Sequence, residues 1–547
     1  MKQKILLFML LVMAVPVTMM ADNVVIDNVY YSLNTTKKTA TVKQYKYTGD
    51  IVIPDYVTYN DVRYKVTSTE DFAFCNNGSD VTTIIFPSTM TSIGNGALSH
   101  QENLTSVTLP NNYLFKEITR CLFWGCTGLT SINIPNGVVT IGESAFADCT
   151  GLTSINLNQV QTINNMAFEG CTGLTSIVIP KSVKKIYYGT IRNCTNLISI
   201  SVDENNIYYD SRNNCNAIIE KSTNTLVSGI NNTVIPNSVT IIESLAFEGC
   251  TGLTSIDIPS NVTCIRNNAF TGCTGLTSII IPSSVTDIWD YAFSNCNSLQ
   301  TVTCNATSVP STSSYAFNGN NLDNVTLLVP EEAVESYKTK TPWSNFGTIR
   351  PADVTITISS VGMATYCSPY DLDFSGITDF KACIATGYNR TTGNVIMQPV
   401  SDAPAGTGLY LQGTPGEYQV PCGESGSFFV NLLVGTTAAT TISPVDGNYK
   451  NLILYNGSNG VGFYTIANDY PMGANKAYLQ LPAAVLGGSA GANRIGVEFE
   501  DNLDGIENID MIAADGATWY SLNGCKLNGK PIQKGIYVVN GRKVVIK

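Results

Sequence analysis

The segment CTGLTSINIP, at residues 126–135, returns almost unchanged along the chain. Its other copies start at Cys149, Cys171, Cys250 and Cys273. A second half such as NGVVTIGESAFAD, at 136–148, follows, so that the unit reads C-x-x-L-x-S-I-x-I-P-x-x-V-x-x-I-x-x-x-A-F-x-x. Within each run the cysteines are 22 or 23 residues apart. A fixed period of this length indicates a solenoid, because one unit cannot bury its own apolar residues but a stack can.

Each unit is expected to contribute one short strand to a parallel sheet. Ile132 and Ile134 alternate with Ser131 and Asn133, so the two pairs face opposite sides of that strand. The following Pro135 lacks a backbone donor and ends it. The return segment closes the core, and its GESAFADC stretch is too short for a regular helix. Its core residues are Ile141, Ala145, Phe146 and Cys149.

The chain has sixteen cysteines, which in an exported protein suggest disulfides. A cysteine that recurs with the repeat, however, marks one position in a unit. Stacked coils would hold these side chains about 4.8 Å apart, which is wider than the Cβ spacing a disulfide prefers. We therefore expect small, buried, mostly free thiols, with oxidation of a pair such as Cys121 and Cys126 as the alternative.

The start of the chain has the pattern of a secretory signal. Lys2 and Lys4 precede an apolar run from Ile5 to Val17, and Ala21 offers a cleavage site. The run is shorter than the about 20 residues of a membrane span, so we expect export and no transmembrane span after signal removal. With a net charge of −11 and only 13% charged residues, the chain lacks the basic footprint of a nucleic-acid partner.

The repeat resembles that of the BspA-like, Treponema-type leucine-rich repeat proteins, which are exposed on the surface of anaerobic bacteria. The resemblance extends over roughly residues 28–350. Residues 46–75 are similar to the opening unit of these proteins, 208–248 to their longer insert-like units and 328–350 to their closing cap. It implies a leucine-rich-repeat solenoid that adheres or binds ligands at the cell surface, without a shared enzymatic activity.

Past Pro351 the period disappears, and short runs such as GLYLQG and NLILYNG alternate with Gly, Pro and Asn turns. This spacing predicts an all-β sandwich or barrel. The tail from Tyr520 resembles the C-terminal sorting domain of the type IX secretion route; a small capping β-domain is the alternative. We therefore expect a signal peptide (1–21), a capped solenoid (22–350), an all-β domain (351–500) and a linker with a sorting or anchoring tail (501–547).

Residues for catalysis are scarce. His100 is the only histidine, and we find no CxxC, P-loop or dinucleotide-binding motif. GGSAG at 487–491 would make Ser489 a nucleophile, but no helical pattern follows it and His100 lies far upstream. The pair Asp371 and Asp373 would suit a glycosidase only at a suitable separation in space. We predict no catalytic residue, no metal site and no cofactor.

A binding surface is better supported by the sequence. The concave strand face is expected to display small side chains from successive units: Thr130, Ser131, Asn133, Thr153, Ser154, Asn156, Thr175, Ser176, Val178, Thr254, Ser255, Asp257, Thr277, Ser278 and Ile280. Departures from the repeat add aromatic and basic contacts at Arg120, Phe123, Trp124, Tyr187, Tyr188, Trp289 and Tyr291. The alternative is that the Thr-Ser pairs are simply solvated strand residues.

The leading hypothesis is an exported cell-surface protein that binds a host or matrix protein, or a glycan, through the solenoid without catalysis. A second hypothesis is a structural spacer in which the solenoid carries the β-domain outward. A third is an envelope hydrolase with its site in 351–500.

Overall fold

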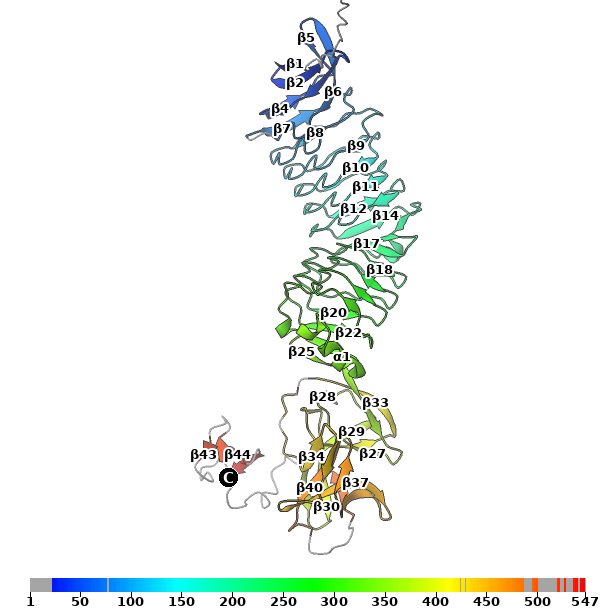
Figure 1. Cartoon of the computed structure of the whole chain (residues 1–547), viewed down its shortest axis with the longest axis vertical. Helices are drawn as coiled ribbons and strands as arrows, with labels where there is room; N and C mark the ends of the chain where they lie inside the picture. The colour runs from blue at the N-terminus through cyan, green and yellow to red at the C-terminus, as the bar shows by residue number, and fades with distance from the viewer. Residues whose placement is uncertain are drawn as a thin grey trace, which may run out of the picture. The chain divides into compact units, whose positions relative to one another are not determined.

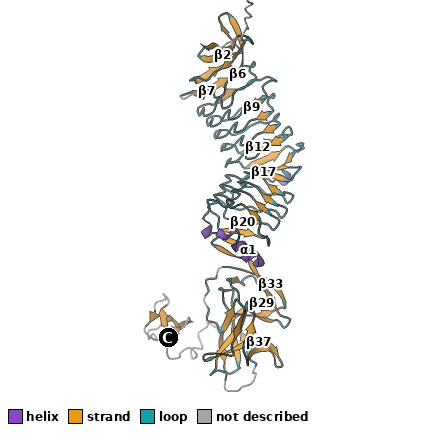
Figure 2. Ribbon diagram, in the orientation of Figure 1, coloured by secondary structure: helices purple, strands orange, loops and turns teal. Residues whose placement is uncertain are grey.

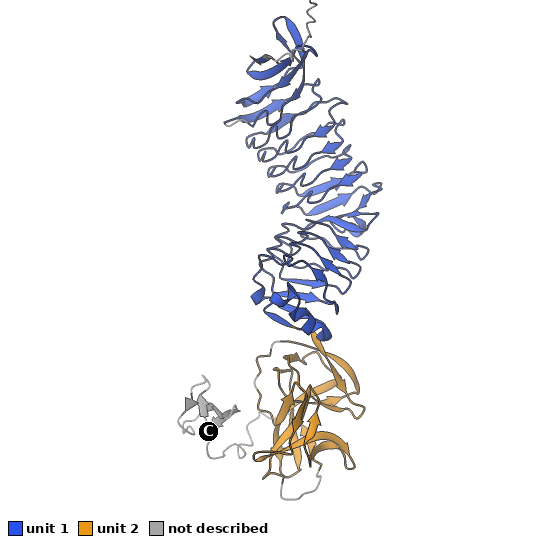
Figure 3. Ribbon diagram, in the orientation of Figure 1, with its two compact units in different colours: residues 1–349 blue, residues 350–547 orange. Residues whose placement is uncertain are grey.

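The computed structural model describes residues 22–75, 78–423, 425–427, 429–486, 494–499, 519–521, 526–527, 535–539 and 542–546. The segment predicted as a signal, Ser489 and most of the C-terminal tail therefore lie outside the described residues. The fold is mainly β, as predicted, with 38% strand and 4% helix. The chain divides into two compact units, residues 1–349 and 350–547 (Figure 3).

Unit 1 opens with a small sheet and continues as a stack of coils (Figure 1). The opening sheet has the order β1-β2-β3-β6-β5. Its strands are β1 (Asp22–Ile26), β2 (Val29–Asn34), β3 (Thr39–Val42), β6 (Val62–Thr69) and β5 (Tyr56–Tyr59). Coils of about 23 residues follow, which confirms the predicted solenoid.

The S-I-x-I segments form parallel strands in several coils (Figure 2). These strands are β4 (Thr48–Val52), β7 (Asp80–Ile85), β8 (Ser106–Thr108), β12 (Ser176–Ile179), β14 (Ser199–Val202), β20 (Ser278–Ile281), β22 (Thr301–Cys304) and β24 (Thr326–Val329). The prediction of a strand in every unit is wrong, because residues 131–134 form none. That segment carries Asn133 where β12 and β20 carry Val178 and Ile280, and Asn disfavours a strand interior.

A second parallel ladder runs along the return segments, and the sequence analysis missed it. Its strands are β9 (Glu117–Ile118), β10 (Thr140–Ile141), β11 (Thr162–Ile163) and β13 (Lys185–Ile186), then β17 (Thr225–Gly229), β18 (Ile241–Ile242), β19 (Cys264–Ile265), β21 (Asp287–Ile288) and β23 (Ser311–Thr312). Most have only two residues, so they show no alternation that a sequence pattern could reveal.

A third row of hydrogen bonds joins the A-F turns of adjacent coils. The Phe146 N–H donates to the Ala167 carbonyl at 2.9 Å, and the Asp148 N–H to the Glu169 carbonyl at 2.7 Å. The residue before the repeat cysteine has a positive φ, 56° at Asp148 and 70° at Gly272, which explains why Gly, Asn and Asp predominate there.

Phenylalanine and cysteine columns fill the core of the coils. Phe123 stacks on Phe146 with ring centroids 5.2 Å apart, and Phe270 on Phe293 at the same spacing. Phe123 is therefore a core residue with no exposed surface, and its assignment to the binding surface is wrong. Every described cysteine is free, including Cys121 and Cys126, as expected.

Two segments of unit 1 depart from the 23-residue repeat. Residues 208–229 insert β15 (Tyr209–Asp210), η1 (Arg212–Asn214) and the antiparallel pair of β16 (Ala217–Glu220) with β17. At the end of the solenoid, η3 (Glu331–Ala333), α1 (Val334–Lys338) and η4 (Trp343–Asn345) cover the last coil. Trp343 and Tyr337 of this cap are fully buried in the core of the last coils.

Unit 2 is all-β. β26 (Asp353–Ile358) pairs with β33 (Gly416–Pro421), and β27 (Met363–Tyr366), β32 (Leu409–Gly413), β29 (Phe380–Asn389), β30 (Asn394–Pro399) and β41 (Gly496–Phe499) form one sheet. β34 (Leu433–Thr436), β40 (Lys476–Pro482), β37 (Tyr449–Gly457) and β36 (Val445–Asp446) form another, with β38 (Gly460–Thr465) paired to β37. Further along the chain, β43 (Lys526–Leu527), β42 (Trp519–Ser521), β44 (Gly535–Val539) and β45 (Arg542–Ile546) pair antiparallel.

Candidate binding surface

The small side chains predicted to face outward do face outward. All fifteen of the Thr, Ser and following positions named above are exposed; we call this set the Thr-Ser face. Two of its members are large and apolar, because Val178 is 56% exposed and Ile280 is 49% exposed. Exposure at that level leaves these side chains available to a partner, since the coil itself does not cover them.

Two of the five threonine hydroxyls on this face are hydrogen-bonded within the stack. The Thr153 hydroxyl donates to the Thr130 carbonyl at 3.2 Å, and the Thr277 hydroxyl to the Thr254 carbonyl at 3.3 Å. These threonines thus support the stacking of coils. Ser131, Ser154, Ser176, Ser255 and Ser278 make no side-chain hydrogen bond to any described residue, so their hydroxyls remain open to solvent.

Strand pairing aligns further side chains with the Thr-Ser face. Val178 pairs with Ser201 in the next coil. Asp257, Ile280, Thr303 and Leu328 are successive register partners in four adjacent coils. Near the N-terminal end, exposed Val52 pairs with exposed Ile85. Val52 and Ile85 were not predicted, although the IVIP (51–54) and IIFP (84–87) segments place them in the same register as Val178 and Ile280.

The predicted aromatic residues lie in separate places. Trp124 is exposed, its ring centroid is 4.6 Å from that of His100, and its indole N–H donates to Asp148 Oδ2 at 3.0 Å. Tyr187 is half-buried beneath the Lys185 ammonium, which is 4.3 Å from the ring centroid, and Tyr188 is exposed. No ring contact between described residues joins these groups to Trp289 or Tyr291.

A second aromatic group lies in the last coils. Arg266 approaches the Trp289 ring at 5.5 Å and forms an ion pair with Glu243 at 2.5 Å. Tyr291 stacks on Tyr315 with ring centroids 5.5 Å apart, and both are exposed. The sequence analysis missed Tyr315, which occupies the same position of the next coil and was readable from the SYAF sequence.

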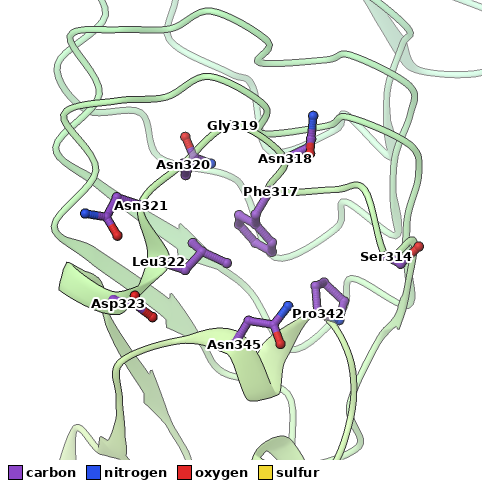
Figure 4. Close-up of a pocket in the computed structure, with 10 residues that line it drawn as sticks. All are labelled: Ser314, Phe317, Asn318, Gly319, Asn320, Asn321, Leu322, Asp323, Pro342 and Asn345. Atoms are coloured by element: carbon purple, nitrogen blue, oxygen red, sulfur yellow. The ribbon is translucent and has the colours of Figure 1, made fainter.

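A polar pocket of about 320 Å³ lies beside this group, at the end of the solenoid (Figure 4). One side is formed by the turn of the last coil, and Pro342 and Asn345 of the cap lie opposite. The remaining lining residues are Ser314, Phe317, Asn318, Gly319, Asn320, Asn321, Leu322 and Asp323. Asparagine side chains both donate and accept hydrogen bonds, so the pocket suits an uncharged polar ligand.

The two carboxylates considered for hydrolysis, Asp371 and Asp373, accept hydrogen bonds from nearby residues of unit 2. Asp371 Oδ1 accepts from the Ala405 N–H at 2.8 Å and its Oδ2 from the Ser425 N–H at 2.9 Å. Hydrogen bonding from Ser375 lowers the pKa of Asp373. A glycosidase acid requires a raised pKa, so Asp373 lacks the property that general acid catalysis needs.

Within the described residues, the other candidate side chains form no catalytic or metal-binding cluster. His100 lies in a turn with a φ of 56°, exposed beside Trp124. Among the residues that the structure describes, no group of three or more His, Cys, Asp or Glu is placed to hold a metal ion. Over the same part of the chain, no helix has the length and apolar character needed to cross a membrane.

Comparison with solved structures finds bacterial leucine-rich repeat proteins. One is described as a leucine-rich cell surface protein from Faecalibacterium prausnitzii, with 24% identity, a TM-score of 0.45 and coverage of 60% of this chain and 95% of that chain. Another is the pneumococcal vaccine antigen PcpA, with 17% identity, a TM-score of 0.45 and coverage of 61% and 100%. A leucine-rich repeat protein from Bacteroides ovatus has 25% identity, a TM-score of 0.36 and coverage of 60% and 99%.

Family comparison identifies the repeat itself. No curated protein matches the chain. The profile of the BspA type leucine-rich repeat region matches in six copies, over residues 67–198, 116–228 and 219–337. The matched residues coincide with the coils from β6 to α1. The solenoid of this chain is therefore a leucine-rich repeat region of the BspA type.

Proposed function

We propose that the chain is an exported cell-surface protein that binds an extracellular protein or polysaccharide through its solenoid, without catalysis. The observation that carries the proposal is the Thr-Ser face, where the third outward position changes between coils while the Thr, Ser and core positions repeat. Val178, Asp257 and Ile280 occupy equivalent positions with different chemistry. A row of different side chains in register provides several contacts for one extended ligand, as in other solenoids.

A binding screen on matrix proteins and polysaccharides tests this role. The chain starting at residue 22 is expected to bind at least one probe saturably. Replacing Val178 and Ile280 together with Lys should weaken that binding about tenfold, because both side chains are exposed on the proposed face. Thr274→Lys, at an exposed turn position outside the face, is the matched control. Equal loss in both variants, or no saturable binding, would contradict the proposal.

Export and retention form a separate part of the proposal. Residues 1–21 supply the signal, and the tail from Tyr520 supplies sorting or surface retention, as the resemblance to type IX tails implies. Protease shaving of intact cells should release the protein, and removal of residues 520–547 should leave it inside the envelope. An intracellular protein resistant to shaving would refute the surface assignment.

The two alternatives make different predictions. If the solenoid is only a spacer, deletion of residues 352–500 abolishes ligand binding, so retention of all binding counts against it. If unit 2 is a hydrolase, residues 352–500 should turn over a substrate, and replacing Asp371 or Ser489 should abolish turnover. The hydrogen bonds that hold Asp371 to the main chain of Ala405 and Ser425 favour a structural role for this carboxylate.

A further inference from the structure

The row of hydrogen bonds between A-F turns ends at the last coil with open donors. Phe270 donates its N–H to the Ala292 carbonyl at 2.7 Å, and Phe293 donates to Ala316 at 2.8 Å. Two residues further along each turn, Gly272 donates to Ser294 and Asn295 to Asn318. The equivalent N–H groups of Phe317 and Gly319 have no hydrogen-bond partner among the described residues.

The open donors belong to the pocket, because Phe317 and Gly319 both line it. The cap covers the core of the last coil but leaves this corner open, with Pro342 and Asn345 on the far side (Figure 4). Phe317 is 2% exposed, so its main-chain donor lies in a poorly solvated place. A buried N–H without an acceptor costs free energy, because it has lost its hydrogen bond to water. A ligand oxygen that accepts from this N–H removes that cost, which favours binding.

Asn320 also marks the end of the regular stack. It takes the place of the repeat cysteine, and its amide donates to the Phe293 carbonyl at 2.8 Å, as Cys296 Sγ does to the Phe270 carbonyl at 3.2 Å. Its Oδ1 is buried without a partner. The last coil therefore keeps the bonds to its predecessor, while the N–H groups of Phe317 and Gly319 and the Oδ1 of Asn320 have no partner among the described residues.

The chemistry of the pocket restricts the occupant. An anion is disfavoured because the lining contains Asp323 and no cationic side chain. In the preceding coils the acceptors are carbonyls of alternate residues, such as Ala316 and Asn318. A polypeptide segment in the conformation of an A-F turn offers that spacing, and the amides of Asn318, Asn321 and Asn345 can pair with its other main-chain groups.

We propose that this pocket binds an uncharged polypeptide segment of a partner protein in the conformation of an A-F turn, whose carbonyls at alternate residues accept from the N–H groups of Phe317 and Gly319. The segment continues the A-F ladder by one turn. This assignment rests on the proposed binding function and specifies one site and one ligand class for it.

The test uses the chain from residue 22 and a capped peptide with the sequence NNAFTG, which is residues 267–272. In the solenoid the carbonyls of this segment accept from the N–H groups of Leu245, Phe247 and Gly249. Saturable binding is expected, together with slower hydrogen exchange at Phe317 and Gly319. Asn345→Trp, which fills the pocket, should weaken binding at least about tenfold.

The control is Asn324→Trp, at an exposed position on the neighbouring η2 (Leu322–Asn324) that does not line the pocket. It should bind the peptide as the parent chain does, and both variants should unfold at the same temperature. No binding, unchanged binding by Asn345→Trp, or protection elsewhere would overturn the pocket assignment. If Asn345→Trp leaves peptide binding unchanged while a polysaccharide or matrix protein still binds with full affinity, the proposed function stands and only this site is refuted.

Discussion

At the scale of single residues, the repeat cysteine is explained by its surroundings. Cys149 Sγ donates to the Phe123 carbonyl and Cys171 Sγ to the Phe146 carbonyl, each at 3.0 Å. Burial raises the pKa of Cys149, Cys194 and Cys296 to about 12. A thiol that is small, neutral and able to donate weakly fits a column where each coil faces the carbonyls of another.

This environment predicts slow alkylation of the native protein. Iodoacetamide at pH 8 should leave the buried repeat cysteines unmodified, because the thiolate is the reactive form. After denaturation without reductant, mass spectrometry should find nearly all sixteen cysteines modified. Few modified cysteines in the denatured chain would show that they are oxidised, and would contradict the free-thiol column.

The same pKa values predict a loss of stability at alkaline pH. Since the folded pKa is raised, the neutral thiols favour folding fully below the unfolded value of about 8.5. Their contribution is lost as the pH rises from there to about 12. The unfolding temperature should therefore fall as the pH rises above about 8.5, and it should fall less steeply in Cys149→Ala. An equal slope in that variant would argue against the assignment.

Backbone conformation can be tested at Gly272. Its φ is 70°, and an added Cβ would come no closer than 3.9 Å to other atoms, so Gly272→Ala isolates the conformational cost. We expect a loss of about 1 kcal/mol in the free energy of unfolding. Gly376→Ala, at an open position without a positive φ, is the control and should be neutral or stabilising. Equal effects at both positions would contradict this explanation.

At the scale of elements, an ion triad stabilises the stack where the insert interrupts it. Arg192 contacts Glu169 of the preceding coil and Glu248, 56 residues later, with Nη1 3.1 Å from both carboxylate oxygens of Glu248. Burial raises the pKa of Glu248 although Arg192 lowers it. The triad joins coils on either side of the insert at residues that lie far apart in the sequence.

Removal of the Arg192 charge should leave two carboxylates close together. Arg192→Met is expected to cost about 2–3 kcal/mol in the free energy of unfolding, below the range for fully buried pairs because the side chains are about one-fifth exposed. Combining it with Glu169→Gln and Glu248→Gln should restore most of the loss. Arg120→Met breaks an exposed pair at 3.4 Å and should change stability by less than about 0.5 kcal/mol. Similar losses in both single variants would refute the triad's role.

The elements were unequally predictable. The period and the alternation around Ile177 and Ile279 predicted coils with inward isoleucines, and these residues are buried. The alternation could not show that Asn133 prevents pairing while Val178 permits it, because pairing depends on both neighbouring coils. The two-residue strand β10 was invisible for a related reason: its hydrogen bonds come only from coils 22 or 23 residues away.

At the scale of the whole molecule, a repeat stack needs its ends covered. In the cap, the Trp343 indole N–H donates to Thr312 Oγ1 at 3.2 Å, and the Tyr337 hydroxyl donates to the Ala306 carbonyl at 2.8 Å. Without this cap, the aromatic core of the last coil would face water. Resemblance to a closing cap at 328–350 predicted such a segment, but only the fold shows which side chains enter the core.

Trp343→Ala should therefore destabilise the solenoid by about 3–5 kcal/mol. The control is Trp289→Ala, because Trp289 is 43% exposed and its removal loses less buried surface, together with the contact with Arg266, so that its effect should be smaller. Denaturant unfolding of both variants measures the difference. A small effect at Trp343 would mean that the cap is dispensable for stability.

The surface was harder to predict than the core. Exposure of the Thr-Ser face followed from strand alternation, but which aromatic rings lie in contact depends on how the coils stack. The pocket at the end of the stack was unpredictable, because it arises where a further coil is replaced by the cap. Open donors at Phe317 and Gly319 are a property of that boundary and of no single residue type.

The most direct test of the proposed function compares ligand binding by two proteins. One is the isolated solenoid, residues 22–349, and the other is the chain from residue 22 to residue 547. Unit 1 has its own hydrophobic cores and is expected to fold alone. If the solenoid carries the function, both proteins bind the same extracellular ligand with equal affinity, and Val178→Lys with Ile280→Lys weakens both. If only the longer protein binds, recognition depends on residues beyond 349, and the account given for the Thr-Ser face is wrong.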